Sequence, residues 1–95
     1  MVVDGGGVVV GALGAALPNP ASGMVAVPFT LEQGTHVRIA LYDALGAEVA
    51  VAIDARVGAG EHVARADASA LPSGVYTIRL AIGDRSAVRT VTVVR

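Results

Sequence analysis

The chain of 95 residues contains no cysteine and no tryptophan, and aromatic residues make up only 3% of it. The absence of cysteine excludes a disulfide framework, a zinc site with thiolate ligands and catalysis by a thiol. Charge is also sparse: the net charge is -1, and the seven basic residues are scattered along the sequence. No basic stripe is present to neutralise phosphates, so we expect no nucleic-acid partner.

Small and β-branched apolar residues dominate what is present. Hydrophobic residues form 54% of the chain, mostly valine and alanine, and they are accompanied by 12 glycines and 4 prolines. Valine favours strands because its branched side chain packs well on a pleated surface. Glycine and proline mark turns. The composition therefore favours one all-β domain, which at this length buries roughly 60–65% of the surface of the unfolded chain.

The first 16 residues differ in composition from the rest of the chain. The run VVVGALGAAL is far shorter than the roughly 20 residues that a membrane-spanning helix needs. It also lacks the preceding basic residue of a signal peptide, because Asp4 stands there instead. We expect residues 1–16 to be a flexible linker and residues 17–95 to form the domain, which begins at the turn sequence LPNPASG.

From residue 24 onward, apolar and polar residues alternate in segments that are separated by turn residues, as in half-buried strands. The residues expected to face the core are, segment by segment, Val25, Val27, Phe29 and Leu31; Val37, Ile39 and Leu41; Tyr76, Ile78, Leu80 and Ile82; and Val91 with Val93. Pro28 cannot donate a backbone hydrogen bond, so we expect its strand at a protected sheet edge and the protein to be a monomer. The spacing of the segments predicts an antiparallel β-sandwich of about six to seven strands.

Glycine and aspartate mark the turns between these strands. Gly46 and Gly74 are expected to adopt backbone conformations that other residues avoid. The aspartates expected at or beside turns, where their side chains can accept backbone N–H groups, are Asp43, Asp54, Asp67 and Asp84. Tyr76 begins the buried face of its strand, and we expect its hydroxyl to bond a backbone group near the rim of the core.

The residue types that carry chemistry form no recognisable site. His36 and His62 would have to converge with a carboxylate to bind a metal, and His36 is expected to face outward. The aspartates lack the spacing of a calcium loop, and no Gly-x-Ser-x-Gly surrounds Ser69 or Ser73. Tyr42 is expected on an outward face, where pairing across strands is favoured over stacking on a sugar. We expect no catalytic residue, metal, cofactor or small-molecule substrate.

Several motifs follow one another in a fixed order: LPNPA, FTL, HVRIALYDALGAEVA, GAGEHVARADASALPSGVYTIRL and VTVVR. This series resembles the type A C-terminal sorting domains of the type IX secretion system. The landmarks of the family pattern are Pro18, Asn19, Pro20, Gly46, Gly60, His62, Gly74 and Tyr76. The resemblance implies that His62 lies on the packing face of its strand. The chain departs from the pattern at residues 21–23, where Phe-Asn-Pro is frequent, and at Ala66, where tryptophan is frequent.

The resemblance implies that the domain acts as a sorting signal. Such domains stand at the C-terminus of exported enzymes and adhesins, are recognised by the outer-membrane translocon, and are commonly removed by a sortase-like peptidase. The implied partners are therefore the translocon, that peptidase and an upstream cargo domain in the same chain. The implied location is the cell surface or the medium, reached through the periplasm. The residues implied in recognition are those of the terminal strand, Val91, Val93, Val94 and Arg95.

Two other functions remain open at this point. The same layout occurs in the immunoglobulin-like domain of the flagellar hook-capping protein, and an assembly module of that kind predicts sequence beyond Arg95. A binding or adhesion module for carbohydrate or protein predicts a row of exposed rings, of which only Tyr42 is available. Both alternatives share the expected immunoglobulin-like sandwich.

Overall fold

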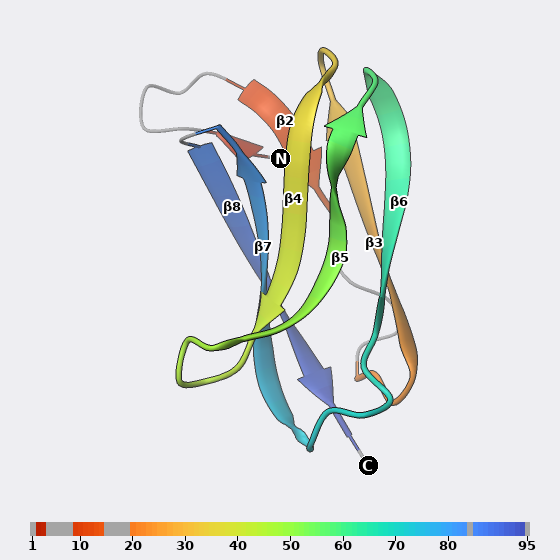
Figure 1. The fold of residues 1–95 in the computed structure, drawn as a ribbon, viewed down its shortest axis with the longest axis vertical. Coiled ribbons are helices and arrows are strands. Elements are labelled where there is room, and N and C mark those ends of the chain that lie inside the picture. Colours follow the sequence, from red (N-terminus) through yellow and green to blue (C-terminus); the bar gives the residue numbers. More distant parts are fainter. Residues whose placement is uncertain (1, 4–8, 15–19, 84, 95) are drawn as a thin grey trace.

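The computed structural model describes residues 2–3, 9–14, 20–83 and 85–94, and these form two facing antiparallel sheets (Figure 1). The strands are β1 (Val2–Val3), β2 (Val9–Leu13), β3 (Met24–Leu31), β4 (Thr35–Tyr42), β5 (Glu48–Val57), β6 (Gly60–Asp67), β7 (Gly74–Ile82) and β8 (Arg85–Val93). The first sheet has the order β1-β2-β3-β6 and the second the order β5-β4-β7-β8. The predicted all-β sandwich is confirmed, and its six expected strands are β3 to β8.

The core lies between the two sheets and is built by residues with a period of two. All of the alternating residues expected inside are buried, except Ile82, which is half-buried. The largest fully buried side chains are Phe29, Ile39, Leu41, Ile78, Leu80, Val25, Val27, Val37, Val91 and Val93. Burial of each such side chain contributes roughly 1.5–3 kcal/mol. Among the described residues no polar or charged side chain is buried, so apolar packing alone makes this core.

Tyr76 supplies one of the few rings of the core. Its side chain is 6% exposed, and its hydroxyl donates to the carbonyl oxygen of Pro72 over 2.6 Å. The expected backbone partner at the rim is therefore confirmed. On the facing sheet, Ala66 is buried at the position where the family often has tryptophan, so this part of the core is filled by a small side chain.

The position of Pro28 differs from the expectation of an edge strand. β3 lies between β2 and β6, with residues Gly11 to Leu13 paired to β3 on one side. The carbonyl of Pro28 accepts a hydrogen bond from the N–H of Gly14 over 2.8 Å. Since N–H and C=O of a strand residue point to the same side, the missing donor of Pro28 faces the end of β2 and leaves the β3–β6 ladder intact. The edge assignment is wrong, and the expected monomer loses that support.

Residues 9–13 were expected to belong to a flexible linker, yet in the structure they form β2. The sequence VVGAL has no period of two that would indicate a half-buried strand. The neighbouring strand β3 explains why these residues are extended, because its backbone N–H and C=O groups pair with those of β2 in register. The division of the chain at residue 16 stays a prediction.

Among the glycines that the structure describes, three have a positive φ, and Gly74 is not one of them. Gly46 has φ 86°, Gly60 has φ 117° and Gly83 has φ 61°. The expectation for Gly46 is confirmed, whereas that for Gly74 is wrong because this residue already begins the extended strand β7. Gly83 lies between β7 and β8, where Ile82 pairs with Arg85, and Asp84, another aspartate expected at a turn, lies outside the described residues.

A backbone bridge joins the start of the sandwich to its end. Ala21 pairs in parallel with Val93: the N–H of Ala21 donates to the carbonyl of Thr92 over 2.7 Å, and the N–H of Val94 donates to the carbonyl of Ala21 over 2.8 Å. We call this contact the Ala21–Val93 bridge. It covers the outer edge of β8 at its C-terminal end.

Candidate functional site

The C-terminal strand presents its candidate residues in two different ways. Val91 and Val93 are 0% and 1% exposed and pack in the core, whereas the side chain of Val94 is 48% exposed. Arg95 lies outside the described residues. Of these three candidate side chains, only that of Val94 is therefore accessible to a partner of the folded domain, and the two buried valines hold the strand in place.

The other landmarks are structural where the structure describes them. Pro18 and Asn19 lie outside the described residues, and Pro20 is exposed at the bend before Ala21. His62 lies on the inner side of β6, where its ring stacks on Phe29 with 5.3 Å between centroids. Nε2 of His62 donates to the carbonyl oxygen of Gly58 over 2.7 Å. Through this stacking and this bond, the imidazole supports the rim of the core.

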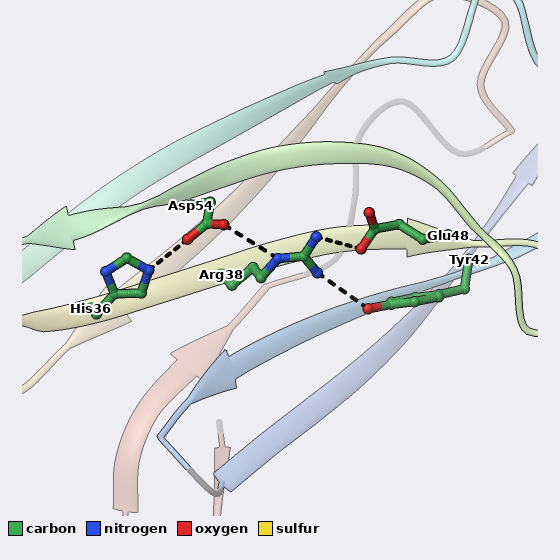
Figure 2. Close-up of polar contacts among 5 residues, drawn as sticks. All are labelled: His36, Arg38, Tyr42, Glu48 and Asp54. Carbon is green, nitrogen blue, oxygen red and sulfur yellow. Dashed lines mark hydrogen bonds and ion pairs between the residues drawn. The ribbon is translucent and has the colours of Figure 1, made fainter.

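Five polar side chains meet on the outer face of the second sheet (Figure 2). Arg38 lies at their centre: Nη2 pairs with Glu48, Nε lies 3.4 Å from Oδ2 of Asp54, and Nη1 donates to the Tyr42 hydroxyl over 3.4 Å. Nε2 of His36 lies 2.5 Å from Oδ1 of Asp54. We call this group the Arg38 cluster. Asp54 therefore pairs across strands in β5, and its expected place at a turn is wrong.

The contacts of the Arg38 cluster favour the ionised forms of Asp54 and Arg38. The hydrogen bond from His36 lowers the pKa of Asp54 below its ordinary value, and the bond to Glu48 raises the pKa of Arg38. The side chains are between 34% and 64% exposed, so water screens these pairs and each contributes little to stability. The carboxylates are engaged by cations, and no hydroxyl or thiol stands beside a free base, so the cluster is a surface ion-pair network.

Sequence reasoning missed this cluster because it depends on the register between β4 and β5. Arg38 lies opposite Asp54, and Tyr42 opposite Glu48, with two irregularities in the ladder between these pairs. The opposite charges on neighbouring segments were the available signal, but the ambiguous pattern of β5 gave no register.

Outside the Arg38 cluster, the described residues form few features that resemble a site. They include no group of three or more histidine, aspartate or glutamate side chains that could hold a metal ion. They also include no helix long and apolar enough to cross a membrane. A shallow, open depression of about 500 Å³ lies on the outer face beside the β4–β5 turn. Its lining residues are Tyr42, Asp43, Ala44, Gly46, Thr77, Arg79, Ser86 and Val88.

Comparison with known proteins identifies the family. No curated protein and no solved structure matches the chain. A family model described as a secretion system C-terminal sorting domain matches residues 15–94. This range contains the six strands β3 to β8, and so the whole of the sandwich that carries the motif series. Domains of this family direct an upstream cargo through type IX secretion to the cell surface or the medium. The chain belongs to the family of type IX secretion C-terminal sorting domains.

Proposed function

We propose that the outer-membrane translocon recognises this sandwich as a folded unit, chiefly at the C-terminal end of β8, and that the domain itself catalyses no reaction. One observation carries the proposal: the strand end combines buried anchors with an exposed valine. Val91 and Val93 fix the direction of the strand, while Val94 projects beyond the core. In this proposal the translocon binds Val94 and the basic Arg95, and the buried Val91 and Val93 position them.

The proposed mode of recognition depends on which backbone groups at the end of β8 already form hydrogen bonds within the domain. The Ala21–Val93 bridge uses the carbonyl of Thr92 and the N–H of Val94 within the domain. Addition of a partner strand along this part of the edge would have to break those bonds. Recognition in our proposal therefore depends on exposed side chains at the strand end and on the outer sheet face, with the bridge left closed.

A sortase-like peptidase is the proposed second partner. Residues 1–16 would then connect the upstream cargo to the sandwich, with β2 docked on β3. A peptidase needs an accessible extended backbone, which the paired strands from Met24 onward do not offer. We place cleavage upstream of the Ala21–Val93 bridge, because a cut there leaves the sandwich closed.

The test uses the full 95-residue chain behind a reporter that has its own inner-membrane export signal, expressed in a type IX-competent cell. We expect the reporter at the cell surface or in the medium, and in the periplasm when the translocon is absent. The combined variant Val94→Asp with Arg95→Glu should retain the reporter in the periplasm with an unchanged melting temperature. The proposal fails if the fusion stays periplasmic while a known sorting domain delivers the same reporter.

A further inference from the structure

The most exposed apolar side chain of the described residues lies at the tip of the β4–β5 turn. Leu45 is 95% exposed, more than any other large hydrophobic side chain described. Single exposed leucines are common on protein surfaces and need no special explanation. The surroundings of Leu45 are therefore what must decide whether this side chain has a role.

The turn that carries Leu45 is held by its own hydrogen bonds. Oδ1 of Asp43 accepts the N–H groups of Leu45 and Ala47, each over 2.9 Å. The backbone of Asp43 also bonds Ala47 over 2.9 Å and Gly46 over 3.0 Å. Gly46 supplies the positive φ that the turn requires. Because the turn is already ordered, a partner that binds Leu45 orders little additional backbone.

The depression on the outer sheet face begins directly beside this turn. Asp43, Ala44 and Gly46 form one wall, and Tyr42 and Val88 add apolar surface. Val88 itself is 60% exposed, so the apolar area continues from the turn onto β8. An apolar surface at a preformed turn is the kind of area that a protein partner buries.

Arg79 gives this surface its charge. Arg79 belongs to β7, where it pairs with Ala40 of β4 on one side and with Val88 of β8 on the other. Its side chain lines the depression. Within the described part of the chain, no carboxylate forms an ion pair with Arg79, whereas Arg38 on the neighbouring strand has two. An exposed arginine without an internal partner is suited to a carboxylate on another molecule.

The β4–β5 turn lies toward the same end of the sheet as the C-terminus, and the depression extends from the turn along β7 and β8 toward Ser86. Thr77 of β7 pairs with Tyr42 and with Thr90, and Gly74 pairs with Val93. Figure 1 shows the β4–β5 turn and the C-terminal end of β8 in the lower half of the molecule. One partner can therefore contact the strand end and the turn together.

We propose that Leu45 and the adjoining depression form a second docking site for the export machinery, occupied by a protein surface with an apolar socket for Leu45 and a carboxylate for Arg79. The inference rests on the proposed function, because the protein that binds this second site is the translocon that also binds the end of β8. The single exposed ring excludes a stacking platform for glycans, and one unpaired arginine is too few for a nucleic-acid backbone.

The first experiment compares Leu45→Ser with Val63→Ser in the reporter fusion. Val63 is exposed on the outer face of β6, in the other sheet, and is the matched control. Loss of one buried leucine from an interface should weaken binding about tenfold, so export should fall several-fold for Leu45→Ser and stay unchanged for Val63→Ser. Equal melting temperatures establish that both variants fold. Unchanged export of a folded Leu45→Ser protein overturns the docking site.

The second experiment tests the charge and identifies the occupant. Arg79→Glu should reduce export strongly and Arg79→Lys only in part, while Arg65→Glu on the exposed face of β6 should have no effect. A photoreactive residue at position 45 should cross-link to a translocon component, and one at position 63 should not. If Arg79→Glu exports normally, or if position 45 yields no such product, the inference is wrong. Failure of the unmodified fusion to reach the surface would instead refute the proposed function.

Discussion

Replacing Tyr76 by phenylalanine removes a single oxygen atom and keeps the ring in the core. The hydroxyl is the donor of the 2.6 Å bond to Pro72, and Pro72 itself is exposed, so water can reach the carbonyl that loses its partner. The cost is therefore that of one hydrogen bond, about 1 kcal/mol, without a full penalty for an unsatisfied buried group. For a domain of this size we expect the melting temperature to fall by about 4–8 °C.

The assay is thermal unfolding followed by circular dichroism, with Tyr42→Phe as the matched control. The hydroxyl of Tyr42 accepts only a 3.4 Å contact from Arg38 on a half-exposed face, so its loss should change the melting temperature by less than about 2 °C. If the two variants melt alike, the bond to Pro72 does not secure the core. If Tyr76→Phe destabilises as strongly as deletion of the ring, the cost does not come from the hydroxyl alone.

The remaining predictions concern two glycines and one carboxylate. Gly46→Ala forces a side chain into φ 86° and should cost about 1–2 kcal/mol, whereas Gly74→Ala should be nearly neutral because its Cβ would lie in ordinary contact, 3.9 Å from Cε1 of Tyr76. Urea unfolding of both variants checks this order, and equal losses would contradict it. The bond from His36 lowers the pKa of Asp54, so its contribution to stability is present above the usual value of 3.8 and is lost as the pH falls through the lowered value. The melting temperature of the unmodified protein should therefore fall more steeply in acid than that of Asp54→Asn, and parallel pH curves would contradict the assignment.

The alternation of apolar residues was sufficient to predict the inner faces of four strands. Val37, Ile39 and Leu41 had to lie on one side of a strand, because successive side chains of a strand point to opposite faces, and all three are buried. The ordered motif series and the spacing of the turns then indicated the family. These features are local, and a single sequence records them directly.

Neighbour relations between strands were harder to predict from the sequence. Pro28 shows which donor is missing but not which side of β3 that donor would face, so the edge assignment failed. β2 was overlooked because a glycine-containing apolar run resembles a linker until an unpaired strand is available beside it. Asp54 contacts Arg38 only because of the register between β4 and β5. That register includes two irregularities, which the alternation of apolar and polar residues does not reveal.

The Ala21–Val93 bridge also has a consequence for biosynthesis. Ribosomes make residues 91–94 after every other strand of the sandwich, and these residues supply two buried valines and the N–H that Ala21 accepts. A chain that terminates before Val91 lacks all three contributions and leaves the end of β7, where Gly74 pairs with Val93 and Tyr76 with Val91, without its partner strand. Such a product offers proteases an open core. Closure of the domain therefore requires that translation has passed through residue 94.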